Sequence, residues 1–135
     1  MPARRRMQVP PNCDLTLGMT CVEKGQGGST RWRMVADERF ANPAGILQGG
    51  FLCGFCDSSM GAAAVTSVGE RKVFASNAEL KVSFLAPVPV GTVLFCHAQV
   101  VGGGARVAFV EASVTTADGD LVGRASSTYL FKDRP

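Results

Sequence analysis

The chain has 135 residues, of which 46% are hydrophobic and 19% are charged, and its formal net charge is +3. This length predicts one domain with a sizeable core, and the low charge argues against disorder and favours self-association. Three arginines, Arg4 to Arg6, lie together near the N-terminus, and without them 11 basic residues balance 11 acidic ones. The domain therefore lacks the basic face that is typical of nucleic-acid binding.

The chain contains no continuous apolar run of about 18 residues that could span a membrane, and its N-terminus lacks the apolar core of a signal peptide. We therefore expect a cytoplasmic protein that does not bind membranes. The cysteines are odd in number and irregularly spaced, which favours reduced thiols over a disulfide framework. They are Cys13, Cys21, Cys53, Cys56 and Cys96.

Turn-forming residues and the alternation of apolar and polar residues indicate the first elements of the chain. Residues 1–12 hold the arginine cluster and a Pro-Pro pair, so we expect them to form a flexible tail, and residues 13–135 to form the domain. Two strands are predicted at 19–23 and 29–36, with the glycine-rich turn 25–28 between them.

One long helix is predicted over residues 49–67, after the turn cluster 42–45 and before a stop at Gly69. Apolar side chains recur on one side of this helix at helical spacing; they are Phe51, Leu52, Phe55, Ala62 and Val65.

The second half of the chain alternates between apolar and polar residues, as strands do. One apolar face is made of Ala78, Leu80, Val82 and Phe84, and further strands are predicted over 92–101, 106–116 and 121–132. Because short turns join the last four strands, we expect them to be antiparallel neighbours. The order of elements predicts an α+β fold in which the helix buries its apolar side on an antiparallel sheet.

A second stripe of the helix carries small residues and a single carboxylate: Gly50, Gly54, Asp57, Gly61 and Ala64. Each glycine costs a helix up to about 1 kcal/mol relative to alanine, so three on one face indicate close approach by another chain, a strand or a ligand. Asp57 would stand in that contact as a functional carboxylate, although an exposed or salt-bridged aspartate would explain it equally simply.

The helix start is the other candidate feature. Gly49 and Gly50 follow a turn and are expected to present free backbone N–H groups at the positive end of the helix dipole. Such an end can stabilise an anion or a developing oxyanion.

The stretch Asn-Pro-Ala-Gly-Ile-Leu-Gln-Gly-Gly at 42–50, followed by Asp57 eight residues after Gly49, resembles the hotdog-fold thioesterases, in particular the branch that includes the phenylacetate-pathway thioesterases. Residues 79–87 are similar to the strand that follows the helix in this family, and the resemblance covers roughly residues 15–132. It implies a hotdog fold, in which an antiparallel sheet wraps around one long central helix. It also implies acyl-CoA thioester hydrolysis without a metal or organic cofactor, at the interface of a homodimer or of a homotetramer built as a dimer of dimers.

The resemblance also implies roles for single residues. Asp57 matches the catalytic carboxylate, which acts as general base or nucleophile, and the N–H of Gly49 matches the group that polarises the thioester carbonyl. Asn42 matches a residue that positions the thioester or the water, and Asn77 lies near a water-positioning Ser or Thr of related enzymes. Gln48 replaces a histidine that is frequent in the family, and with Gly50 it is expected to help position the substrate.

The length of the helix supports the sharing of the site between subunits that the resemblance implies. Eight helical positions separate Gly49 from Asp57, which corresponds to about 12 Å. One scissile carbonyl cannot contact both residues if each must act within about 3 Å, so the Asp57 of a neighbouring subunit is expected to meet this Gly49.

Other residues leave alternatives open. Arg106, Arg124 and Lys132 are candidates for binding the phosphates of CoA or are ordinary surface charges. Because Gln48 departs from the family pattern, a non-catalytic acyl-CoA-binding protein is one alternative function. A dithiol redox protein that uses Cys53 and Cys56 is another, although the parallel unit that usually carries such a site is not predicted here.

Overall fold

The computed structural model describes residues 8–135, so the predicted tail arginines, Arg4 to Arg6, lie outside the described residues. Within this range the helices are α1 (Asn12–Leu17), the short 3-10 helix η1 (Glu38–Phe40) and α2 (Gly49–Ser67). The strands are β1 (Thr20–Gly25), β2 (Ser29–Val35), β3 (Val73–Phe84), β4 (Val93–Gly103), β5 (Val107–Thr116) and β6 (Leu121–Asp133). The predicted bounds of the long helix are confirmed, whereas α1 was not predicted because one and a half turns carry too little periodicity.

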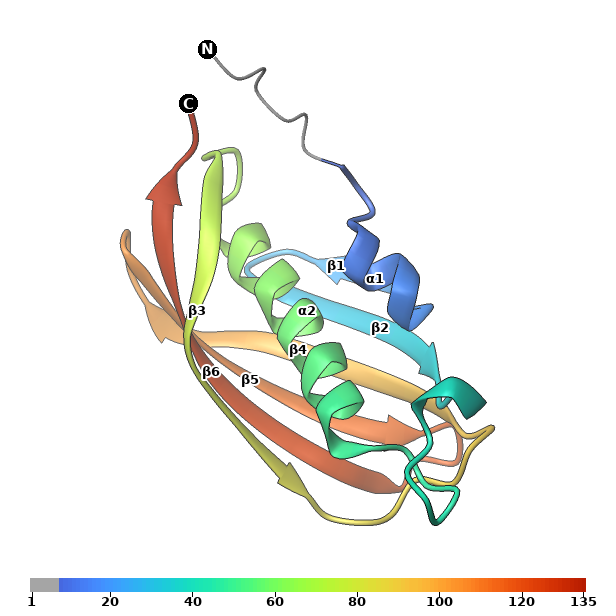
Figure 1. Ribbon diagram of the computed structural model, residues 1–135. Helices are drawn as coiled ribbons and strands as arrows, with labels where there is room; N and C mark the ends of the chain where they lie inside the picture. Colours follow the sequence, from blue (N-terminus) through green and yellow to red (C-terminus); the bar gives the residue numbers. More distant parts are fainter. Residues whose placement is uncertain (1–7) are drawn as a thin grey trace.

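The six strands form one antiparallel sheet in the order β1-β2-β4-β5-β6-β3, and this sheet curls around α2 (Figure 1). The α+β class and the helix wrapped by an antiparallel sheet are therefore confirmed. Strands β1 and β3 are the two edges of the sheet. The described part of the chain contains no helix that is long and apolar enough to cross a membrane.

One prediction about strand pairing is wrong. β4, β5 and β6 are neighbours as expected, but β3 pairs with β6 and not with β4. The connection from β3 to β4 is not a tight hairpin, because it crosses the end of the sheet beside the start of α2. There the carbonyl of Val88 accepts a hydrogen bond from the N–H of Leu47 at 2.8 Å, and Pro89 forms a bridge with Ile46.

A β-bulge corrects the predicted apolar face of β3. The register shifts between Asn77 and Glu79, so the intervening Ala78 is exposed and does not share the helix-facing side with Leu80. The bulge has a functional consequence, because it lets Asn77 and Leu80, three residues apart, both turn toward α2. Asn77 thereby becomes a polar group on the inner side of an edge strand.

The side of α2 that packs on the sheet is rotated from the predicted one. Its buried residues are Leu52, Phe55, Cys56, Ser59, Met60, Ala63 and Ala64. By contrast, Val65 is 41% exposed, and Phe51 turns aside to stack on Phe40 of η1 at 4.4 Å between ring centroids. The prediction failed because α2 is apolar on nearly all sides, so the spacing of its apolar residues does not single out one face.

Candidate active site

Asp57 lies in the middle of α2 and faces strands β3 and β6. Its Oδ1 accepts a hydrogen bond from the Nδ2 of Asn77 at 2.9 Å and another from the hydroxyl of Tyr129 at 2.7 Å. Its Oδ2 makes no hydrogen bond with any residue that the structure describes. Asp57 and Asn77, which the sequence had selected separately, are thus in direct contact, and neither side chain is fully buried.

The network continues on β6, where the sequence had pointed only to Arg124 and Lys132, as candidates for binding phosphate. The hydroxyl of Ser127 lies 2.7 Å from Oδ1 of Asn77, which also accepts the N–H of Glu79 at 3.1 Å. Because a backbone N–H can only donate, the contact with Glu79 fixes the amide of Asn77 with its nitrogen toward Asp57. Ser127 and Tyr129 lie two positions apart on one strand, and both point inward. Polar residues on the inner face of a strand, in line with the apolar Ala125, are the signal that could have identified them.

Tyr129 is buried, and this burial raises the pKa of its phenol; the hydrogen bond to the carboxylate of Asp57 raises it further. The phenol is therefore a neutral hydrogen-bond donor at any ordinary pH. In this state it donates a hydrogen bond to Asp57 and cannot itself serve as a base.

The start of α2 differs from the prediction in one respect. The N–H of Gly50 is not free, because it donates to Oε1 of Gln48 at 2.9 Å, so Gln48 acts as the N-cap of the helix. The N–H of Gly49, one residue earlier, makes no hydrogen bond with the described residues. The expected free donor is thus Gly49 alone, and Gln48 holds the loop by a hydrogen bond that a histidine could also form.

The side chains that lie against the glycine stripe of α2 also belong to this same chain. A Cβ added at Gly54 would lie 3.5 Å from Cδ1 of Leu17 in α1, and one added at Gly61 would lie 3.5 Å from the ring of Tyr129. A Cβ at Gly50 would meet the capping side chain of Gln48 at 2.8 Å. The neighbours of the stripe are thus a short helix, a strand and a cap, and at Gly54 and Gly61 a Cβ would make only ordinary van der Waals contacts.

Asn42 shapes the loop in front of α2. Its Oδ1 accepts the N–H of Ala44 at 2.9 Å and that of Ile46 at 3.1 Å, which makes a compact turn. Its Nδ2 makes no hydrogen bond with the described residues and remains a donor for another group.

A pocket of about 320 Å³ opens beside Gly49. Its walls are largely apolar and include Leu52, Phe84 and residues 85–88. Phe84 is 57% exposed, and a Cβ added at Gly49 would lie 3.0 Å from its Cζ, so a side chain at residue 49 would push this ring away from the helix start. The free N–H of Gly49 therefore lies at an apolar pocket.

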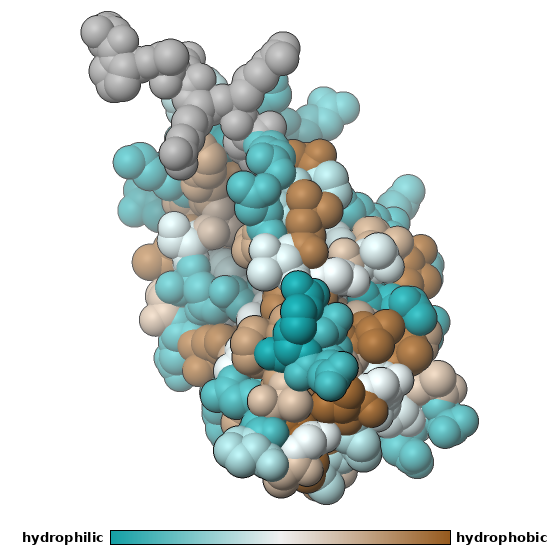
Figure 2. All heavy atoms as spheres, turned by 45° about the vertical axis from the view of Figure 1, so that its right-hand side comes forward, coloured by the Kyte–Doolittle hydropathy of each residue, from teal (hydrophilic) through white to brown (hydrophobic). Residues whose placement is uncertain are grey.

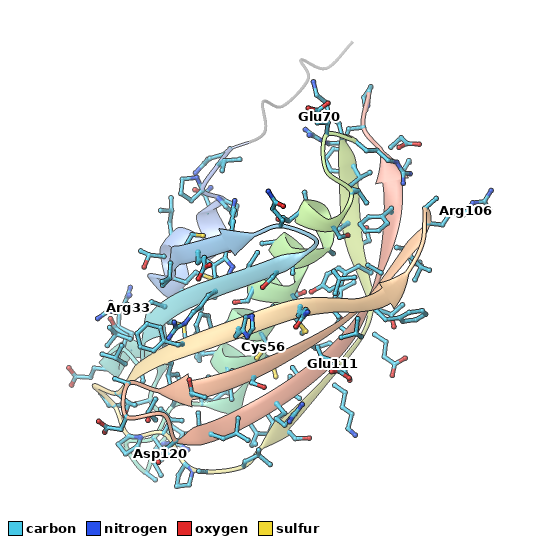
Figure 3. All side chains as sticks on the ribbon, turned by 180° about the vertical axis from the view of Figure 1, so that it is seen from behind. Arg33, Cys56, Glu70, Arg106, Glu111 and Asp120 are labelled. Carbon is cyan, nitrogen blue, oxygen red and sulfur yellow. The ribbon has the colours of Figure 1, made fainter. Side chains whose placement is uncertain are left out.

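Of the three candidates for binding CoA phosphates, Arg124 lines a pocket. It borders a pocket of about 270 Å³ on the outer side of β3 and β6 together with Lys81, a basic residue that sequence reasoning had not selected. Arg106 projects from the β4–β5 turn, away from the sheet (Figure 3). Lys132 is exposed near the end of β6 and lines none of the pockets described here.

The thiol pair Cys53 and Cys56 is poorly suited to redox chemistry. All five cysteines are free, and Cys56 is fully buried in the core. The neighbouring thiol of Cys96 and burial both raise the pKa of Cys56, so it stays protonated and unreactive. Among residues 8–135 no three His, Cys, Asp or Glu side chains gather as metal ligands. His97 is exposed on β4 and contacts the hydroxyl of Ser29 at 3.1 Å, in keeping with a hydrogen-bonded histidine outside the site.

Comparisons with known proteins show the family to which the chain is similar. The family model described as the thioesterase superfamily matches residues 44–123, which include the Gly49 helix start, Asp57 and Asn77. No curated protein is significantly similar to the chain in sequence.

Solved structures with the same fold include a putative thioesterase from Ralstonia eutropha JMP134 that is described as related to phenylacetic acid degradation. It is 29% identical, with a TM-score of 0.81 over 89% of this chain and 89% of that one. The E. coli protein PaaI, from the phenylacetic acid degradation operon, is 18% identical, with a TM-score of 0.82 over 89% and 83% of the two chains. A Streptococcus mutans protein solved with bound acetyl-CoA is also 18% identical, with a TM-score of 0.78 over 86% and 90%. At 18% identity, the last two similarities establish the shared fold only.

Proposed function

The chain belongs to the thioesterase superfamily, and from this premise we propose that it hydrolyses an acyl-CoA thioester at a site formed by two subunits. Asp57 is the general base, and the N–H of Gly49 stabilises the oxyanion. The hydrolase domain comprises residues 13–135, to which α1 contributes by packing Leu17 on α2.

One observation carries this proposal: a carboxylate whose Oδ1 is held by two donors while its Oδ2 stays open. A general base needs a fixed orientation and a free oxygen within reach of the proton it takes. Asp57 has both. The free N–H of Gly49 lies at a helix start, where it can donate a hydrogen bond to an oxyanion.

The reaction proceeds in two steps. Asp57 takes a proton from water while the water oxygen attacks the thioester carbon, and the carbonyl oxygen becomes an oxyanion next to the N–H of Gly49. The tetrahedral intermediate then collapses, the carbon–sulfur bond breaks, and the CoA thiolate takes the proton from Asp57. The products are a carboxylic acid and free CoA, and Asp57 returns to its starting state without any cofactor. Asn77 holds the base, and the free Nδ2 of Asn42 donates a hydrogen bond to the thioester or to the attacking water.

The edge strand β3 supports the proposal of a shared site. It is 12 residues long, its outer edge is unpaired within the described chain, and it carries Asn77 beside Asp57. Such an edge readily pairs with a second chain. Exposed apolar side chains mark both of its ends, namely Phe74, Phe84 and Leu85, whereas on the face seen in Figure 2 apolar groups are interspersed with polar ones. We therefore propose a homodimer joined through β3, or a tetramer of such dimers.

The acyl-CoA substrate class is supported by the fold shared with a protein that binds acetyl-CoA. Lys81 and Arg124 border a pocket on the outer side of β3 and β6, close to the proposed subunit boundary, and are suited to phosphate groups. The apolar pocket beside Gly49 is suited to an uncharged part of the substrate.

The proposal is tested by incubating the wild-type protein with a panel of short-chain, medium-chain and aryl acyl-CoA thioesters. The products are separated by chromatography, because a thiol-reactive dye would also label the five cysteines. We expect at least one thioester to be hydrolysed with a kcat on the order of 1 per second or more. Binding of acyl-CoA without turnover of any panel member would instead identify a non-catalytic acyl-CoA-binding protein.

A further inference from the structure

We propose that Tyr129 is a positioning residue for Asp57: its hydroxyl, together with Asn77, holds Oδ1 so that Oδ2 is the oxygen that meets the reactants. This inference rests on the proposed hydrolysis, and it assigns a role to a residue on a strand far from the helix in sequence.

The hydroxyl of Tyr129 contacts Asp57 at two points. It lies 2.7 Å from Oδ1 and 2.8 Å from the backbone carbonyl oxygen of the same residue. A phenol has one proton, and the carboxylate is the stronger acceptor, so the proton points to Oδ1. The side chain and the backbone of Asp57 are thus tied to one fixed atom, which restricts rotation of the carboxylate.

Asn77 makes the arrangement selective for one oxygen. Its Nδ2 donates to the same Oδ1 at 2.9 Å, and its own Oδ1 is held by Ser127 and by the N–H of Glu79. Both donors therefore converge on one carboxylate oxygen, and the described residues donate no hydrogen bond to the other. The oxygen without donors keeps its lone pairs available and is the better proton acceptor.

The ring of Tyr129 packs directly on α2. A Cβ added at Gly61, one turn after Asp57, would be in ordinary van der Waals contact with this ring at 3.5 Å. Tyr129 itself is only 2% exposed, so its ring is held by the core and its hydroxyl cannot move away. The rigid ring of Tyr129 on the sheet therefore fixes the orientation of the Asp57 carboxylate.

Loss of the Tyr129 hydroxyl should lower the rate of the chemical step and leave substrate binding unchanged. In Tyr129→Phe the ring keeps its packing, but Asp57 loses one of two donors and can rotate. A misplaced base lowers the rate at which the bound thioester reacts, so kcat should fall by about 10- to 100-fold while KM stays within about twofold. Thr128→Val is the matched control, because it removes a hydroxyl from the adjacent residue, whose side chain points to the outer side of the sheet.

The test measures kcat and KM for wild type, Tyr129→Phe and Thr128→Val, each also in an Asp57→Ala background. We expect Tyr129→Phe to lower kcat only where Asp57 is present. A rise in KM at unchanged kcat, or an equal loss of the residual rate in the Asp57→Ala background, would overturn the positioning role.

A second readout is independent of turnover. In protein labelled with ¹³C at aspartate carboxyl groups, Tyr129→Phe is expected to move the Asp57 resonance, whereas Thr128→Val is expected to leave it in place. An unmoved resonance in Tyr129→Phe contradicts the inference even if the enzyme is inactive. An inactive wild type combined with a moved resonance would refute the proposed hydrolysis and retain the contact.

Discussion

Replacement of Asp57 by asparagine is expected to lower kcat by at least about 100-fold, within the range by which general-base catalysis accelerates reactions. The variant keeps the shape of the side chain and an oxygen that can accept from Asn77 and Tyr129, so the network that surrounds it survives. What it loses is basicity. Asn77 and Tyr129, its hydrogen-bond partners, cannot replace that base, because an amide is not basic and the pKa of Tyr129 is raised.

The fold should tolerate this change and also Asp57→Ala, since the hydroxyl of Tyr129 retains the backbone carbonyl of residue 57 as an acceptor at 2.8 Å. Circular dichroism and size-exclusion chromatography check that the variants are folded and assembled. Asp120→Asn, in the exposed turn between β5 and β6, is the matched control and should retain wild-type kcat. If Asp57→Asn is as active as this control, Asp57 is a structural residue and the assignment of the base is wrong.

Gly49→Pro is expected to reduce kcat by about 100- to 1,000-fold, the usual effect of removing one oxyanion donor. Proline has no N–H, and it is well accepted at the first position of a helix, where that N–H has no intrahelical partner. Gln48 before it has φ −68° and ψ 136°, a conformation that proline permits in its predecessor. The substitution therefore removes the proposed donor and leaves the helix intact.

Gly49→Ala separates the missing donor from the added carbon. Alanine also introduces a Cβ, which would press on Cζ of Phe84 at 3.0 Å, but it keeps the N–H. The exposed ring of Phe84 can turn away in both variants, so the alanine variant should retain most of the wild-type kcat. Equal losses in the two variants would assign the effect to crowding by Phe84 and would remove the N–H of Gly49 from the mechanism.

Local sequence signals were sufficient to predict the helix that carries the site. The bounds of α2 and the free N–H of Gly49 agree with the sequence, because caps, glycines and helical spacing act over a few residues. The cap by Gln48 was missed, since whether its amide turns back to the N–H of Gly50 or toward solvent depends on its rotamer.

Long-range features could not be predicted in the same way. β3 pairs with β6 because residues 85–92 cross the end of the sheet, and no local signal distinguishes such a crossing from a hairpin. The bulge at Ala78 then decides that Asn77 faces inward. Tyr129 was missed because it reaches Asp57 from 72 positions away along the chain, through a pairing that only the complete sheet defines.

The most direct test of the central claim, an active site built from the Gly49 of one subunit and the Asp57 of its partner, combines the two inactive variants. Asp57→Ala and Gly49→Pro are co-expressed with different affinity tags, and the mixed oligomer is isolated by two successive affinity steps. In a symmetric dimer one of the two sites then keeps both groups, so about half of the wild-type kcat per dimer should return. If the mixed oligomer stays as inactive as its parents, the two residues do not act across the interface, and the shared site is contradicted.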